Sequence, residues 1–145
     1  MARRAVTDPR GRTWALRALV AWEARGAGPN ELPAQLRAVW EGRRVSPEAR
    51  LYAETIVRLL ATQLSALDRL IERHLHRWRL ERLTTVDRNV LRLAAAELLY
   101  LDTPPREVLD AAARLADRYG TDDSARFVFG VLDAIRRHRG DGPRG

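Results

Sequence analysis

The side chains best suited to chemistry in this sequence are its arginines, which are concentrated at the two ends of the chain. All 26 basic residues are arginine, against 19 acidic residues. Residues 1–12 and residues 134–145 each hold four arginines and one aspartate, whereas the long segment between them is nearly neutral. Positive charge on flexible ends is suited to attracting a nucleic-acid phosphate backbone. The alternative is a pair of solubilising tails, and a GC-rich coding bias also favours arginine over lysine.

The sequence shows no set of residues typical of catalysis or metal binding. His74 and His76 are two residues apart on a predicted helix, so they point to different sides and cannot share a metal ion. The chain has no cysteine, no glycine-rich phosphate loop, no nucleophile elbow and no carboxylates clustered at metal spacing. We therefore predict a protein that is not an enzyme and that uses no catalytic residue, metal or cofactor.

The elements that must position the arginines are predicted to be helices. Hydrophobic residues make up 46% of the chain and aromatic residues 6%, with alanine and leucine prominent, which favours an all-α fold. At 145 residues the chain is expected to form a single domain, with mobile basic ends at about residues 1–11 and 138–145. No apolar stretch approaches the roughly 18–20 residues of a membrane span, so we expect no membrane contact and a cytoplasmic protein.

The spacing of apolar residues, with breaks at glycine and proline, predicts about seven helices and no strand. The first is expected over about residues 12–25, and Ser46-Pro47-Glu48 is a strong signal for the start of another. The apolar pattern that follows has at most a kink or short break near Ala61–Ser65. Gly120 is expected to end the next-to-last helix in the left-handed conformation.

The helix predicted over Thr84–Leu101 is expected to lie at the centre of the fold. Apolar residues cover more of its circumference than the stripe of about 100° that a surface helix needs, so other helices should pack on more than one of its sides. Glu97 interrupts the apolar second half of this helix. It is the residue most in need of a partner, because a buried unpaired carboxylate is unfavourable.

Three stretches of the sequence carry motifs that can be compared with known families. They are Tyr119–Asp133, Val86–Ala94 with Glu97-Leu98-Leu99 after it, and Arg10-Gly11-Arg12 with the predicted helix that follows. Together they resemble the C-terminal signature, the central motif and the arginine-rich opening of the NusB family of bacterial transcription antitermination factors. The resemblance covers most of the chain. Asp8 and Pro9 stand where arginines are usual in this family, so the N-terminal segment has fewer arginines than is typical.

The resemblance implies two packed helical subdomains and a non-catalytic role in transcription. It implies binding of boxA-type single-stranded RNA together with NusE, a small-subunit ribosomal protein, in a complex that keeps RNA polymerase transcribing ribosomal RNA operons. With charge and position also considered, the residues expected to contact RNA are Arg3, Arg4, Arg10, Arg12, Arg17, Arg106, Asp123, Arg126 and Phe127. The residues expected to contact NusE are Glu81, Asp87 and Arg88.

Two alternatives to this function stay open at the level of sequence. One is the related RNA-binding helical domain of some ribosomal RNA cytosine methyltransferases, although this chain has no room for a cofactor-binding domain. The other is a protein-interaction module or homodimer whose basic ends are only solubilising. Phe129, which replaces an asparagine of the family motif, lies on a polar helix face. It is therefore expected either to be covered by another segment or to be exposed for a base or a protein.

Overall fold

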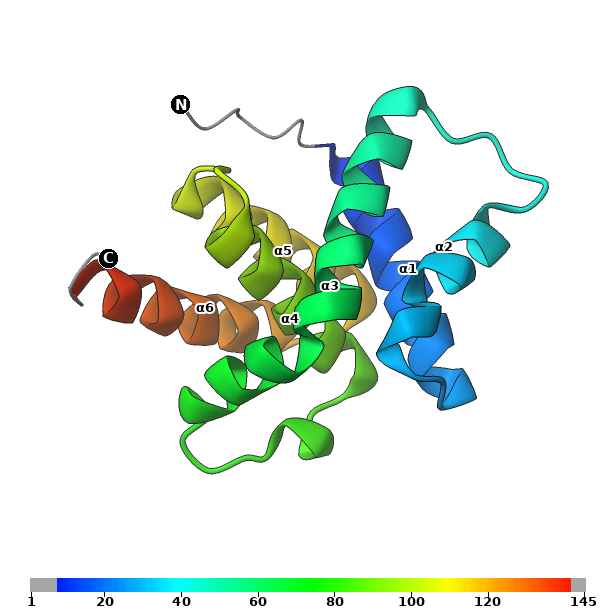
Figure 1. Cartoon of the computed structure of the whole chain (residues 1–145). Helices are drawn as coiled ribbons and strands as arrows, with labels where there is room; N and C mark the ends of the chain where they lie inside the picture. The colour runs from blue at the N-terminus through cyan, green and yellow to red at the C-terminus, as the bar shows by residue number, and fades with distance from the viewer. Residues whose placement is uncertain (1–7, 142–145) are drawn as a thin grey trace.

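The computed structural model describes residues 8–141, and within that range the chain forms six α-helices, two short 3₁₀ helices and no strand (Figure 1). In chain order these elements are α1 (Pro9–Arg25), η1 (Pro29–Glu31), α2 (Leu32–Trp40), α3 (Pro47–Arg73), η2 (Leu80–Arg82), α4 (Thr85–Tyr100), α5 (Pro105–Tyr119) and α6 (Ser124–Asp141). The predicted all-α fold is confirmed. None of the described helices is both long enough and apolar enough to cross a lipid bilayer.

The helices pack as two groups of three that meet along α4. Helices α1, α2 and α3 contact one another, as do α4, α5 and α6, and α4 also packs against α1 and α3 (Figure 1). Every residue of α4 from Asn89 to Leu98 is buried. The prediction that this helix lies at the centre, with neighbours on more than one side, is therefore confirmed.

Helix α3 is longer than the sequence pattern indicated. It runs without interruption for 27 residues, so the kink or short break allowed near Ala61–Ser65 does not occur, and the six α-helices of the described residues agree with the expectation of about seven. The physical reason is that Leu60, Leu64 and Leu67 continue one buried face through this region. A helix whose apolar stripe stays in register has no packing reason to break.

Helix α1 begins earlier than predicted, because Asp8 is its cap and Pro9 its first residue. The Asp8 carboxylate accepts hydrogen bonds from the backbone N–H groups of Arg10, at 2.8 Å, and Gly11, at 3.4 Å. Proline suits the first helical position, because the N–H that it lacks would have no hydrogen-bond partner within the helix. At the other end, α6 continues to Asp141. Residues 9–11 and 138–141 are therefore helical, and the remaining parts of the expected mobile ends, residues 1–7 and 142–145, lie outside the described residues.

Gly120 ends α5, but it does not adopt the left-handed conformation that was predicted. Its φ is −101° and its ψ −151°, whereas Gly26, which ends α1, has a φ of 68°. Glycine is needed at position 120 for a different reason, since a Cβ there would collide with the Ser124 side chain. The Ser124 hydroxyl oxygen accepts a hydrogen bond from the backbone N–H of Thr121 at 2.9 Å and so closes the turn into α6.

Replacing Gly11 with alanine is expected to destabilise the protein. A Cβ at this position would lie 2.8–2.9 Å from Tyr52 side-chain carbons and 3.0 Å from the backbone oxygen of Ala49. Overpacking of this kind costs about 1–3 kcal/mol. Even with the helix preference of alanine in its favour, Gly11→Ala should lower the free energy of unfolding by about 1 kcal/mol or more.

Gly130→Ala is the matched control, measured in the same urea denaturation series. Gly130 also lies inside a helix, α6, but nothing is within 4 Å of an added Cβ there. The substitution should therefore raise the free energy of unfolding by about 0.5–1 kcal/mol. Equal effects of the two substitutions would show that the approach of α1 to α3 is not as tight as described.

Candidate nucleic-acid interface

Arg12, expected on the RNA-binding surface, is instead buried in the core. Its Nε donates to Glu97 Oε1 at 3.0 Å and its terminal nitrogen to Oε2 at 2.6 Å. Only 5% of Arg12 and 1% of Glu97 are exposed. Glu97 thus has the partner that the sequence required. The expected RNA contact of Arg12 is corrected, because its guanidinium has no free surface for a phosphate.

Tyr52 of α3 completes this buried group, since its hydroxyl also donates a hydrogen bond to Glu97. The three side chains tie α1, α3 and α4 together. Burial disfavours the charge on Arg12, but the hydrogen bonds and the negative charge of Glu97 outweigh it and raise the guanidinium pKa above its ordinary value. Burial, and then the charge of Glu97, raise the pKa of the Tyr52 hydroxyl well above its ordinary value. Both Arg12 and Tyr52 therefore stay protonated donors.

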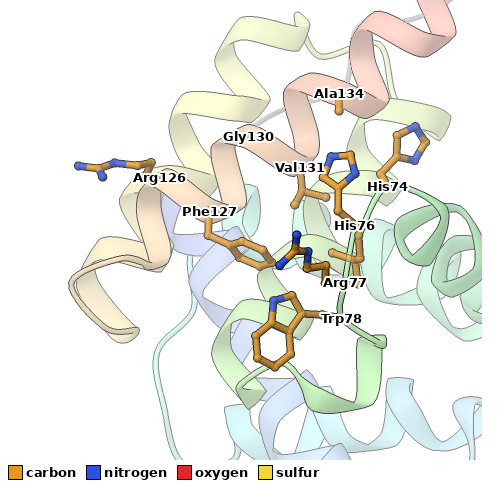
Figure 2. A pocket seen from close by; sticks show the side chains of 10 residues that line it. His74, His76, Arg77, Trp78, Arg126, Phe127, Gly130, Val131 and Ala134 are labelled. Atoms are coloured by element: carbon orange, nitrogen blue, oxygen red, sulfur yellow. The ribbon is translucent and has the colours of Figure 1, made fainter.

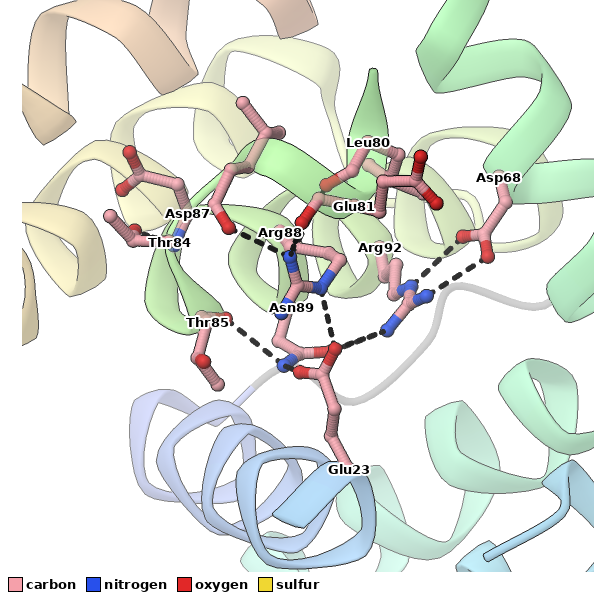
Figure 3. A network of polar contacts seen from close by, with 11 residues as sticks. Glu23, Asp68, Leu80, Glu81, Thr84, Thr85, Asp87, Arg88, Asn89 and Arg92 are labelled. Atoms are coloured by element: carbon pink, nitrogen blue, oxygen red, sulfur yellow. Dashed lines mark hydrogen bonds and ion pairs between the residues drawn. The ribbon is translucent and has the colours of Figure 1, made fainter. Parts of the chain in front are cut away.

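Arg88, expected to contact the partner protein, is engaged inside the chain. It forms an ion pair with Glu23 of α1 at 2.5 Å and donates to the backbone oxygens of Leu83, at 2.7 Å, and Leu80, at 3.2 Å (Figure 3). These bonds engage its Nε and one of its two terminal nitrogens inside the chain. Arg88 thus holds η2 and α4 against α1, and its expected contact with NusE stays a prediction.

The same network continues along α4 through Asn89 and Arg92. The Asn89 amide donates to Glu23 at 2.6 Å, and Arg92 forms two hydrogen bonds with Asp68 of α3, at 2.9 and 3.0 Å (Figure 3). Two carboxylates are thus matched by two guanidinium groups. Glu23, Asp68 and Arg92 line a polar hollow whose wall also holds further charged residues, Arg69, Glu72, Glu81 and Arg88.

The two acidic residues expected to contact NusE differ in exposure. Glu81 is exposed, and within residues 8–141 its side chain has one long contact of 3.4 Å, with Arg79, which is exposed as well. Asp87 is buried in the first turn of α4, where its backbone N–H donates to the Thr84 hydroxyl. One Asp87 carboxylate oxygen has no hydrogen-bond partner among the described residues. A buried acceptor without a partner is unfavourable, so it suits a donor brought by another molecule.

Two of the expected RNA-binding arginines lie exposed on α1. Arg10 and Arg17 are seven residues apart, which places them on the same side of the helix, two turns from each other. The Arg17 guanidinium lies over the ring of Trp14 at 5.3 Å, so it is held by a cation–π contact and still faces solvent. Arg3 and Arg4, the outermost members of the expected set, lie outside the described residues.

The remaining expected residues lie at the start of α5 and of α6. Arg106 is exposed, but its guanidinium lies 5.7 Å from the centre of the Phe129 ring. Phe129 is half-buried and packs against the core, so its ring is covered in part. Asp123, which directly precedes α6, and Arg126 are exposed, whereas Phe127 is half-buried.

Phe127 and Arg126 border a hollow between α6 and the segment that follows α3. The hollow measures about 470 Å³, and Figure 2 shows Trp78 and Arg77 facing Phe127 across it. Trp78 is 55% exposed, an unusual state for so large an aromatic ring. His76 also lines the hollow. The structure thus brings two aromatic rings and Arg77 together, with Arg126 at the edge and its side chain directed away from the rings (Figure 2), whereas no residue of α1 lines this place.

Trp78, Arg77 and His76 were not among the residues predicted for a site. The available signal was a tryptophan within a basic run, in a stretch that is not helical in the structure. A tryptophan in a helix with apolar neighbours is normally part of the core, but one in a loop beside arginines more often contacts a ligand. Exposed aromatic rings beside guanidinium groups can stack unpaired bases and neutralise their phosphates.

Comparison with known proteins gives a consistent identification. The model of the NusB family matches residues 9–137. The transcription antitermination protein NusB of Sorangium cellulosum (strain So ce56) is 44% identical over 131 residues, which cover 90% of this chain and 91% of that protein. The corresponding protein of Treponema denticola (strain ATCC 35405) is 38% identical over 130 residues, covering 88% of this chain and 93% of that protein.

Solved structures give the same result. A structure of T. maritima NusB superposes with a TM-score of 0.82 at 38% identity and covers 90% of this chain and 92% of that one. A crystal structure of the antitermination factors NusB and NusE in complex with double-stranded RNA contains a chain that superposes with a TM-score of 0.77 at 31% identity, covering 90% of this chain and 96% of that chain. From its sequence and its structure, this chain belongs to the NusB family.

Proposed function

We propose that the protein is a non-catalytic transcription antitermination factor of the cytoplasm. It binds boxA-type single-stranded RNA together with a NusE-type ribosomal protein and so keeps RNA polymerase transcribing ribosomal RNA operons. The observation that carries this proposal is the hollow of Trp78 and Phe127 beside Arg77 and Arg126, in a chain of this family. A solved complex of NusB, NusE and double-stranded RNA contains a chain of similar fold, which supports NusE and RNA as partners.

RNA is held in two regions under this proposal. Arg10 and Arg17 on α1 neutralise phosphates, and the hollow receives unpaired bases, with Arg126 at its edge. Aromatic rings can stack only on bases that are not already stacked in a helix. This preference favours a single strand over a duplex.

The partner protein is expected to bind near η2 and the start of α4. Glu81 is exposed there, and the unpaired carboxylate oxygen of Asp87 lies in the adjoining first turn. Acidic groups suit a basic partner such as a ribosomal protein. If both proteins contact the same RNA, each raises the affinity of the other for it by the same factor.

Arg10→Ala and Arg126→Ala are each expected to weaken RNA binding and to reduce its salt dependence. Loss of one phosphate contact lowers the slope of log affinity against log salt concentration by about 0.7 for a single strand. The measurement is filter binding to boxA RNA, a scrambled RNA and a duplex of the boxA sequence across a salt series, with and without NusE.

Arg114→Ala is the matched control, because Arg114 is an exposed arginine of α5 that lies outside both regions. It should leave the salt slope unchanged. Unchanged slopes for Arg10→Ala and Arg126→Ala would remove these residues from the interface. If the unsubstituted protein retains no RNA at low salt, even with NusE, the RNA-binding function itself is excluded and a protein-interaction role is favoured.

A further inference from the structure

A second basic site lies away from the hollow of Trp78, in a crevice between α2 and α3. The crevice has a volume of about 190 Å³ and is lined by both helices. Its wall combines apolar side chains with three arginines and one glutamate: Pro33, Leu36, Arg37, Trp40, Arg50, Glu54, Val57 and Arg58. No residue of this wall belongs to the expected RNA-binding or partner-binding sets.

The three arginines of this crevice are not neutralised within the described part of the chain. No described carboxylate forms an ion pair with Arg37, Arg50 or Arg58. The polar hollow beside α4 is different, because Arg88 and Arg92 are matched there by carboxylates. The α2–α3 crevice therefore carries guanidinium donors that remain available to an anion.

Trp40 supplies the second observation. It is only 5% exposed, and its indole N–H has no hydrogen-bond acceptor among the described residues. A buried tryptophan N–H normally finds an acceptor, so this N–H suits an acceptor group that a bound ligand brings. The Arg50 guanidinium lies 4.5 Å from the centre of the Trp40 ring, so a cation already rests on the face of this indole.

We propose that the α2–α3 crevice is a binding site for a phosphate group. The phosphate oxygens accept hydrogen bonds from Arg37 and Arg58, on facing helices, and one oxygen provides the acceptor that the Trp40 N–H lacks. Because that N–H has almost no contact with solvent, we expect the Arg50 side chain to turn from the indole face toward the phosphate on binding.

A phosphate fits this wall better than a singly charged carboxylate does. Arginine presents its N–H donors in a planar arrangement that matches phosphate oxygens. Three guanidinium groups offer more N–H donors than the two oxygens of a carboxylate can accept in good geometry. Glu54 is the one acidic side chain of the wall and lowers its net charge to +2. That charge matches a phosphate monoester near neutral pH. The same chemistry is offered by a free phosphate monoester and by an RNA phosphodiester, which carries a single charge.

The test follows the indole N–H resonance of Trp40 by NMR while inorganic phosphate, adenosine 5′-monophosphate or a short RNA without a boxA sequence is added at constant ionic strength. We expect inorganic phosphate and the nucleotide to shift this resonance in a saturable way. Assignment uses Trp40→Phe, which keeps an aromatic ring and removes the N–H. A response to the RNA as well would show that phosphodiesters are also accepted.

The variants Arg37→Gln and Arg58→Gln should each weaken phosphate binding about tenfold, as expected for loss of a charge-assisted hydrogen bond. Arg69→Gln, an exposed arginine elsewhere on α3, is the matched control and should bind as the unsubstituted protein does. A Trp40 resonance that does not respond to tens of millimolar phosphate, or that responds equally in all three variants, would overturn the proposal. BoxA binding should be unchanged by all three, so failure here is distinct from failure of the antitermination function.

Discussion

Glu97→Ala is expected to lower the free energy of unfolding by about 3–5 kcal/mol, the largest effect of any substitution considered for this protein. The substitution leaves the Arg12 guanidinium buried and charged without its carboxylate, and a buried ion pair broken on one side costs this much. The Tyr52 hydroxyl loses its acceptor at the same time. Urea denaturation followed by circular dichroism measures the change.

A double-mutant cycle separates the ion pair from simple loss of packing. Arg12→Met with Glu97→Leu removes both charges, and we expect this double variant to be markedly more stable than either single variant. Tyr52→Phe removes one hydrogen bond and should cost only about 1–2 kcal/mol. If the two single effects simply add in the double variant, Arg12 and Glu97 are not coupled and the buried pair is not what holds α1 on α4.

Local rules predicted the starts of several helices, and they also account for the start that was missed. Ser46 and Thr84 cap α3 and α4, as their residue types indicate. Asp8 and Pro9 form the same kind of signal, a capping side chain followed by proline at the first helical position. They were interpreted instead as gaps in an arginine-rich arm. Capping chemistry was the better guide, because it depends only on neighbouring residues.

The roles of individual arginines could not be predicted from sequence, because their partners lie far away along the chain. Arg12 and Glu97 are 85 positions apart, and Arg88 is 65 positions from Glu23. Charge counts treat all arginines alike, whereas the fold places Arg12 and Arg88 in internal ion pairs and leaves Arg10 and Arg17 in solvent. The fold class followed from composition and periodicity, but the division between structural and surface arginines required the tertiary structure.

The hollow beside α6 was predictable only in part, because its two walls come from segments far apart in the sequence. Phe127 and Arg126 were expected to form part of the site, but the other wall comes from the segment after α3. Helix α3 stops at Arg73, and residues 74–79 form a loop. Trp78 therefore projects into the hollow from this loop and not from a helix face (Figure 2). The helical pattern at this point in the sequence did not show where α3 would stop.

Trp78→Ala is expected to weaken the binding of single-stranded boxA RNA by about 1–3 kcal/mol, roughly five- to 150-fold, the loss found when one stacked base loses its aromatic platform. The free energy of unfolding should change little, because more than half of the side chain is exposed. Fluorescence anisotropy with labelled RNA measures the affinity, and binding of a duplex of the same sequence should be nearly unaffected.

Tyr100→Ala and Trp78→Phe decide whether the effect comes from stacking at this place. Tyr100 is also an exposed aromatic residue, but it lies at the end of α4 and outside the hollow, so its loss should leave RNA affinity unchanged. Trp78→Phe keeps a ring and should retain most of the affinity. If Trp78→Ala binds RNA as tightly as the unsubstituted protein, bases do not stack in the hollow. The arginines of α1 would then have to account for RNA binding without it, and the preference for a single strand would lose its physical basis.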